Sequence, residues 1–287
     1  EGKKEGERER RKKDRERKRE EERKGYGTMM NDGVKSNIRA MKPETENGKT
    51  YHIRVGNGDV PGIMLLPGSP ERAMVISKNW EDSKELAFYR EFRTMVGNYQ
   101  GTPIGCTSTG CGPVGAEIAI HELNASGVHT AIRVGSTGSI SPRFDLGDIV
   151  IPVAAIRADG TSDCYVDRGF PAVANVDVVN ALAQACENLG YKYGYGLMYC
   201  PASFYLGQGR KIKEDGYWPS FAPHIIPDLQ SAGVTNIDTD TSGQYIVGQL
   251  HGMRMGAVMS IISNRIRDTW GDNGGEEKVS RVACEAV

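Results

Sequence analysis

Two aspartates with one residue between them are the first candidates for chemistry. Asp238 and Asp240 flank Thr239 in the stretch TNIDTDTSG, residues 235–243. Side chains two positions apart in a strand point to the same side, so both carboxylates could accept hydrogen bonds from sugar hydroxyls. Alternatively, Asp240 or Thr241 could cap a helix that begins here. The stretch alone leaves both interpretations open.

An arginine inside an apolar strand is the second candidate. Arg133 lies in IRVGSTGS, and a buried guanidinium is costly unless an anion pairs with it. The residues after Val134 offer N–H and hydroxyl donors: Gly135, Ser136, Thr137 and Gly138. An arginine followed by short donors suits a phosphate, and a structural salt bridge is the alternative.

Two further turns carry polar groups of the right kind. In LPGSPER, Gly68 leaves room for a ligand, Arg72 adds a charge, and Ser69 with Pro70 marks the start of a helix, where an anion is favoured. In FYLGQGR, Gln208 has an amide donor and acceptor and Arg210 has only donors, which together complement the edge of a pyrimidine. Either turn alone could be an ordinary connection.

The charge of the chain is unevenly distributed. Its 287 residues hold 36 Lys and Arg against 37 Asp and Glu, which gives no reason to expect binding to nucleic acid or a membrane surface. Residues 1–24 contain 13 basic and 9 acidic residues and no large apolar one. Such a segment cannot form a core, so we expect a solvated extension, with a docking arm for a larger assembly as the alternative.

The cysteines and the apolar pattern indicate the compartment. The six cysteines are scattered with no CxxC spacing, which argues against a zinc site and a disulfide framework and favours reduced thiols in the cytoplasm. No apolar run approaches the length of a membrane span, and the N-terminal region has no apolar segment of the signal-peptide kind.

Strand-like and helix-like stretches alternate along the chain, and this order predicts an α/β fold. The expected strands are 62–68, 102–110, 130–140, 147–160, 193–203 and 254–265. The expected helices are 69–80, 112–127, 175–190, 241–252 and 274–287, the last of which runs to the end of the chain and looks incomplete. We therefore expect an extension and linker over residues 1–45 and one domain over residues 46–287, with a central mixed sheet flanked by helices.

Taken together, these turns resemble the nucleoside phosphorylase I family, and in particular its uridine-cleaving members. Nine motifs occur in the family's order: LPGSPER, FYREF, STGCGPVGAEIAIHEL, IRVGSTGSI, GDIVI, RADGTSDCYV, FPAVAN, SFYLGQGR and IISNR. The resemblance runs from about Tyr51 to the end of the chain. It implies a single three-layer domain with a partly barrel-like sheet, and the reversible attack of inorganic phosphate on the ribose C1′ of uridine.

The resemblance also implies roles for individual residues. Phosphate would be held by Gly68, Arg72, Arg133 and Ser136, with Arg90 reaching in from a neighbouring subunit. The base would be bound by Thr137, Gly138, Phe204, Gln208 and Arg210. The ribose would be bound by His52 of a neighbour and by Asp238, Thr239 and Asp240. The residues expected to carry catalysis are Arg133, Arg210 and Asp240. The family needs inorganic phosphate as co-substrate but no metal or organic cofactor, and its shared sites imply at least a homodimer.

The chain departs from the family where the ribose is bound. Asp238, Thr239 and Asp240 stand in place of the usual Glu-Met-Glu, and each aspartate is one methylene shorter, a loss of about 1.3–1.5 Å of reach. Two alternatives to uridine phosphorolysis therefore stay open. One is a phosphorylase fold kept as a structural or binding subunit, and the other is a phosphorylase for another nucleoside. Asn264, where purine-cleaving relatives have an aspartate, favours a pyrimidine.

Overall fold

The computed structural model describes residues 40–45 and 47–287, and Asn47–Val287 form one compact unit. The charged segment 1–24 and most of the linker expected after it lie outside the described residues. In the part of the chain that the structure describes, no helix is both long and apolar enough to cross a bilayer. All six cysteines are free, and only Cys111 and Cys164 are exposed.

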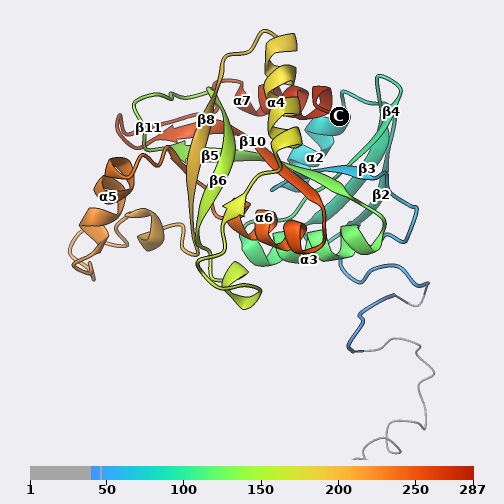
Figure 1. Cartoon of the computed structure of the whole chain (residues 1–287), viewed down its shortest axis with the longest axis horizontal. Helices are drawn as coiled ribbons and strands as arrows, with labels where there is room; N and C mark the ends of the chain where they lie inside the picture. The colour runs from blue at the N-terminus through green and yellow to red at the C-terminus, as the bar shows by residue number, and fades with distance from the viewer. Residues whose placement is uncertain (1–39, 46) are drawn as a thin grey trace, which may run out of the picture. The chain divides into compact units, whose positions relative to one another are not determined.

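A closed ring of five strands lies at the centre of this unit (Figure 1). The ring runs β10–β6–β8–β9–β5, and a second pairing of β10 with β5 closes it. Its strands are β5 (Thr130–Ser139), β6 (Ile149–Ala158), β8 (Tyr193–Pro201), β9 (Asn236–Ile237) and β10 (Arg254–Asn264). The expected mixed, partly barrel-like sheet is confirmed, since β5 and β10 are parallel to each other whereas β6 is antiparallel to β10 and β9 is antiparallel to β5.

The sheet continues beyond the ring on the other side of β5. Parallel pairing adds β1 (Ile63–Pro67) and then β4 (Thr102–Thr107), and antiparallel pairing adds β3 (Phe92–Tyr99) and the edge strand β2 (Glu81–Tyr89). Two short strands complete the described sheet, β7 (Ala172–Val173) on β6 and β11 (Thr269–Trp270) on β10.

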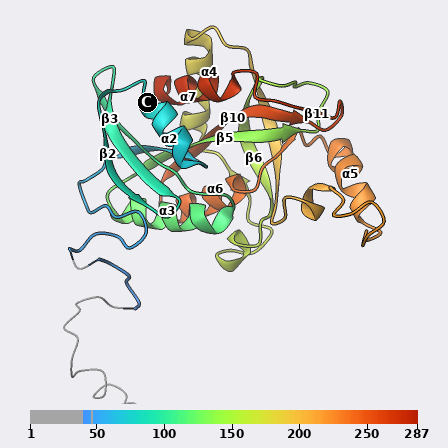
Figure 2. The same ribbon diagram turned by 180° about the vertical axis from the view of Figure 1, so that it is seen from behind.

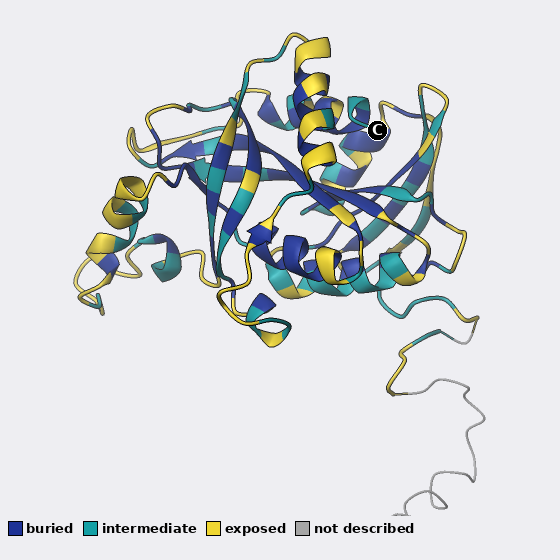
Figure 3. Ribbon diagram, viewed as in Figure 1, coloured by how far each residue is buried: buried dark blue, intermediate teal, exposed yellow. Residues whose placement is uncertain are grey.

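Helices cover the sheet on opposite sides. One group contains α2 (Pro70–Ser77), α4 (Val176–Asn188) and α7 (Gly275–Glu285), and the other contains α3 (Pro113–Ala125) and α6 (Thr241–Leu250); Figure 2 shows the same two layers from behind. Each layer has its own apolar core. Leu123 of α3 and Ile246 of α6 belong to one core, whereas Leu182 of α4 and Val282 of α7 belong to the other. Between the two layers, β5 and β10 are buried along most of their length, whereas β6 and β8 also carry exposed and half-buried residues (Figure 3).

Local signals set the ends of several helices. Ser69 is the N-cap of α2, where its Oγ accepts a hydrogen bond from the N–H of Arg72 at 3.2 Å, and Pro70 is the first helical residue, as expected. Gly127 and Gly190 follow α3 and α4 with φ of 100° and 68°, so they end these helices in the left-handed conformation that glycine adopts most readily. The short helix α5 (Ile225–Ser231) and the hairpin of β2 and β3 were not expected from the sequence.

One buried hydroxyl ties α6 to the ring. The Tyr245 hydroxyl donates to the Pro152 carbonyl of β6 at 2.8 Å, and Tyr245 is fully buried. The pairing of β6 with β8 shifts register between Pro152 and Ala154, so this carbonyl lies at an irregularity of the ladder. The Tyr245 hydroxyl therefore supplies a hydrogen-bond donor to a carbonyl at a position where the pairing of β6 with β8 is irregular.

We predict that Tyr245→Phe lowers the free energy of unfolding by about 1–3 kcal/mol, because it leaves the Pro152 carbonyl buried without a donor. Denaturant unfolding measures the loss. Tyr217→Phe, at a 73% exposed tyrosine, is the matched control and should have no effect. Equal stabilities for wild type and Tyr245→Phe would show that the contact is dispensable.

Candidate active site

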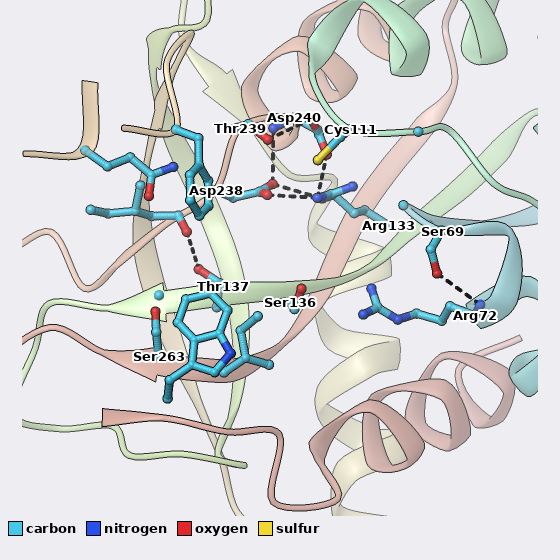
Figure 4. Close-up of a pocket in the computed structure, with 18 of the residues that line it drawn as sticks. Ser69, Arg72, Cys111, Arg133, Ser136, Thr137, Asp238, Thr239, Asp240 and Ser263 are labelled. Atoms are coloured by element: carbon cyan, nitrogen blue, oxygen red, sulfur yellow. Dashed lines mark hydrogen bonds and ion pairs between the residues drawn. The ribbon is translucent and has the colours of Figure 1, made fainter. Parts of the chain in front are cut away.

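A cavity of about 400 Å³ gathers the expected site residues from distant parts of the chain. It is lined by the turn after β1, the segment before α3, the part of β5 from Arg133 to Gly138, the loop after β8, the β9–α6 junction, the end of β10 and β11 (Figure 4). All the candidates except His52 and Arg90 line it: Gly68, Arg72, Arg133, Ser136, Thr137, Gly138, Phe204, Gln208, Arg210, Asp238, Thr239 and Asp240.

At the inner end of the cavity, Arg133 is held by both aspartates. Its Nε and Nη2 donate to the two oxygens of Asp238 at 2.9 and 2.8 Å, and Nη2 lies 2.6 Å from Oδ2 of Asp240. The anionic partner expected for Arg133 is therefore present within the chain. Burial lowers the pKa of the guanidinium, but the charges of Asp238 and Asp240 outweigh burial and hold that pKa above its usual value.

One nitrogen of Arg133 is left over. Nη1 is buried and has no hydrogen-bond partner among the described residues. A buried N–H group normally has an acceptor. Because Arg133 lines the cavity, Nη1 marks a place where an acceptor can bind.

Asp238 has a second role that was not expected. Besides pairing with Arg133, its Oδ2 accepts hydrogen bonds from the N–H and the hydroxyl of Thr241, at 3.1 and 2.6 Å. The capping interpretation, which the sequence left open, holds in part: Asp240 is the N-cap residue of α6, but its side chain makes no capping hydrogen bond, and Asp238 accepts the N–H of Thr241 instead. Burial opposes ionisation of Asp238, but Arg133 and the Thr241 hydroxyl outweigh burial and lower its pKa.

Asp240 is held less firmly. Its carboxylate takes the contact from Arg133, a hydrogen bond from the Thr239 hydroxyl at 3.0 Å, and one from the backbone N–H of Gly112. Burial raises the pKa of Asp240; Arg133 acts against this rise, and the charge of Asp238 adds to it. The two neighbouring acids are therefore unequal, with Asp238 the stronger and Asp240 the weaker.

Two other phosphate candidates, Gly68 and Arg72, line the same cavity as Arg133. The Gly110 N–H donates to the Gly68 carbonyl at 2.9 Å, and a Cβ on Gly68 would lie 3.4 Å from the Gly110 carbonyl oxygen. Arg72 donates through Nε to Oε1 of Glu276 at 2.9 Å. The two candidate phosphate arginines that line this cavity, Arg72 and Arg133, thus both have carboxylate partners.

The opposite end of the cavity has an aromatic face and a pair of polar side chains. The Arg210 guanidinium carbon lies 4.2 Å from the Phe204 ring centroid, and Nη1 of Arg210 donates to Oε1 of Gln208 and to the Phe204 carbonyl. Gln208 is buried and Phe204 is 47% exposed. Burial, and then the charge of Arg265, lower the pKa of Arg210.

Several residues of the site were not found from the sequence. Arg265 donates to the Gln208 and Gly209 carbonyls at 2.9 and 3.3 Å and so fixes the turn that carries Gln208 and Arg210. Further residues that line the cavity are Ser69, Gly110, Cys111, Ile262, Ser263 and Trp270. Arg265 is the last residue of the IISNR motif, so the motif was a usable signal for it. Nothing local marks Trp270, because its place depends on the pairing of β11 with β10.

His52 and Arg90 lie outside this cavity, and both contact Tyr51. The Tyr51 ring, next to His52 in the chain, lies 5.9 Å from the Arg90 guanidinium carbon and packs on Tyr89 at 6.3 Å. Nδ1 of His52 lies 2.6 Å from Oε1 of Glu122. Both residues were expected to serve a neighbouring subunit.

Asn264 also has a structural role. Its Oδ1 accepts the N–H groups of Ile266 and Arg267 at 3.0 and 3.1 Å, and its Nδ2 donates to the Phe144 carbonyl. It is fully buried and does not line the cavity. Its chain neighbour Ser263 lines the cavity instead.

Within residues 40–45 and 47–287, no cluster of three His, Cys, Asp or Glu side chains is arranged to hold a metal ion.

Known proteins with similar sequences and folds belong to one family. A family model described as the phosphorylase superfamily matches residues 62–286. The chain is 45% identical to the uridine phosphorylase of Thermococcus kodakarensis over 88% of this chain and 91% of that protein. It is 32% identical to the uridine phosphorylase of Haemophilus influenzae over 75% and 86%, respectively. The crystal structure of uridine phosphorylase from Vibrio fischeri matches 83% of this chain and 96% of that one, with a TM-score of 0.74 and 26% identity.

We predict that Asp238→Ala lowers the free energy of unfolding by about 3–5 kcal/mol, because it removes the main partner of a buried guanidinium. Asp59→Ala, at the exposed pair with Lys49, should cost at most about 1 kcal/mol. Denaturant unfolding compares the two variants. Because the pKa of Asp238 is lowered in the folded protein, its carboxylate stabilises the fold at pH values above its unfolded pKa. The difference in the free energy of unfolding between wild type and Asp238→Ala should therefore shrink as the pH falls through the folded pKa. Equal costs for both variants would contradict the assignment.

Proposed function

The chain belongs to the phosphorylase superfamily, and we propose that it catalyses the reversible phosphorolysis of uridine. An oxygen of inorganic phosphate attacks C1′ of the ribose, the bond from C1′ to N1 of uracil breaks, and its electron pair leaves with the base. The products are uracil and ribose 1-phosphate. The residues must place the phosphate and stabilise charge on the departing base.

One observation carries this proposal: a single cavity has an anion end, where Arg133 pairs with the two aspartates, and a base-reading end, where Arg210 lies against Phe204 and Gln208. Arg133 with its unpartnered Nη1, Arg72, Ser136 and Gly68 lie at the first end. A nucleoside that bridged the two ends would present C1′ to a phosphate held there. The likeness to uridine phosphorylases along most of the chain supports the same reaction.

The base-reading end favours a pyrimidine. Phe204 offers a face for the ring, and Gln208 with Arg210 offers donors and an acceptor for an edge with two carbonyls and one N–H. The contact between Arg210 and Gln208 orients both side chains before a base binds. Arg265 holds the turn that carries them through its hydrogen bond to the Gln208 carbonyl. Asn264 is a neutral amide whose side chain already makes backbone contacts, so this position offers no acid to a purine.

We also propose that the active form is a homo-oligomer with shared sites. His52 and Arg90 both contact Tyr51 and lie away from their own cavity, which fits side chains that complete the site of a neighbour. His52 would contact the ribose 5′ end and Arg90 the phosphate. The free cysteines, two of them exposed, fit a reducing compartment such as the cytoplasm.

We predict that the purified protein consumes uridine only when inorganic phosphate is present, and consumes inosine far more slowly. Arg133→Ala should abolish turnover, and Arg72→Ala, which leaves the buried aspartates paired, should reduce it. Arg254→Ala, on β10 outside the cavity, is the control. Release of uracil followed by absorbance measures the rate. Cleavage of uridine without phosphate, or of inosine at an equal rate, would remove the proposal.

We predict that Thr239→Met combined with Asp240→Glu raises kcat/KM for uridine. The Asp240 carboxylate is turned to Arg133, Thr239 and Gly112, so it lacks the reach for the ribose hydroxyls. One regained charge-assisted hydrogen bond corresponds to about 1.5–3 kcal/mol, or roughly 10- to 150-fold. Thr239→Met alone is the control. A double variant slower than wild type would show that the short acid suits this pocket.

A further inference from the structure

The anion end of the cavity holds more negative charge than positive charge. Arg133 contributes one positive charge against the carboxylates of Asp238 and Asp240, and all three side chains are more than nine-tenths buried. The charge of Arg72 is balanced by Glu276. An anion that enters here must approach two buried carboxylates, and in such surroundings charges interact far more strongly than in water.

The unpartnered Nη1 of Arg133 still points to an anion at this place. The nitrogen is buried, belongs to a cavity-lining side chain and has no acceptor among the described residues. The Asp240 carboxylate, whose charge would repel such an anion, lies beside this nitrogen, with Oδ2 2.6 Å from Nη2 of the same guanidinium. An oxygen of the anion that reaches Nη1 therefore comes close to the Asp240 carboxylate.

The contacts of the two acids decide which one can change its charge. Asp238 receives two hydrogen bonds from Arg133, two from Thr241 and one from the N–H of Asp240 at 3.3 Å. Protonation of Asp238 would place a proton among these donors. Asp240 has fewer donors, and burial already raises its pKa. Asp240 is the acid that can accept a proton at low cost.

We propose that Asp240 takes up one proton when a phosphate-like dianion binds against Arg133, and that the protonated carboxyl donates this proton as a hydrogen bond to the anion. The inference rests on the proposed function, because it concerns the phosphate end of the same cavity. The proton comes from solvent. Binding then adds a dianion and one proton together, so the buried cluster gains one negative charge instead of two.

The groups around Asp240 come from every element packed on it. Arg133 approaches from β5, Asp238 from the β9–α6 junction, and Cys200 from β8. The N–H of Gly112 approaches from the start of α3. Burial, and then the neighbouring acids, raise the pKa of Cys200 well above its usual range, so this thiol holds its proton and does not compete with Asp240.

Sulfate is the probe that isolates the proton, because it is a dianion that does not titrate near neutral pH. Calorimetric titration of the full chain with sulfate, at constant ionic strength in two buffers of different ionisation enthalpy, reports the protons taken up per anion. Wild type should take up about one proton across roughly pH 5 to 8, and its sulfate affinity should fall about tenfold per pH unit as the pH rises. Phosphate should displace the sulfate.

Two neutral isosteres locate the proton. Asp240→Asn should bind sulfate without proton uptake and with an affinity that stays level with pH. Glu276→Gln, at the other carboxylate beside the anion end, should keep the wild-type proton uptake. A thermal melt checks that each variant is folded. Proton uptake that disappears in Glu276→Gln, or a folded Asp240→Asn that fails to bind sulfate, would overturn the proposal.

The experiment also separates this inference from the proposed function. If sulfate binds, phosphate displaces it and uridine is cleaved, but no proton is taken up, then Asp240 stays ionised and only the inference fails. If neither sulfate nor phosphate binds to wild type, the phosphate end itself is wrongly placed, and both proposals fall.

Discussion

The burial of one arginine is the constraint on which the rest of this structure depends. Arg133 lies in the middle of a ring strand and needs anionic partners, and the chain supplies them from a segment more than a hundred residues later. To reach Arg133, the β9–α6 junction must lie against β5, which the antiparallel pairing of β9 with β5 ensures. The same junction starts α6, and Asp238 stabilises both features at once. A structural ion pair and a binding site are therefore the same group of atoms.

This arrangement gives the two ends of the cavity different kinds of support. The anion end is supported by charge, because Arg133, Asp238 and Asp240 hold one another. The base-reading end is supported by backbone contacts, because Arg265 holds the turn that carries Gln208. Gly138 lets the strands approach where the two ends meet, since a Cβ there would lie 2.7 Å from the Ser263 hydroxyl. The register of β10 shifts between Ile261 and Ser263, a bulge that turns cavity-lining side chains inward.

The sequence predicted the elements whose signals are local. Ser69 with Pro70 marked the start of α2, Gly127 marked the end of α3, and apolar runs marked every ring strand except the two-residue β9. The hairpin of β2 and β3 was missed because β2 is an exposed edge strand with little apolar alternation. The presence of Arg133 and Asp238 in the site was expected, but their direct contact was not, since it depends on how β9 pairs with β5. For the same reason the hydrogen bonds from Asp238 to the first turn of α6 were not expected.

Gly112 fixes one side of the acid-binding part of the site over evolutionary time. Its φ of 105° and ψ of 162° belong to a region that is essentially closed to residues with a side chain, and its N–H is a donor to Asp240. The donor is therefore tied to glycine, whereas the acid opposite it is free to vary in length. A lineage that exchanges aspartate for glutamate at position 240 must absorb the extra methylene in the acid's own segment. The acid at the start of α6 can thus change during evolution, while the glycine at the start of α3 stays the same.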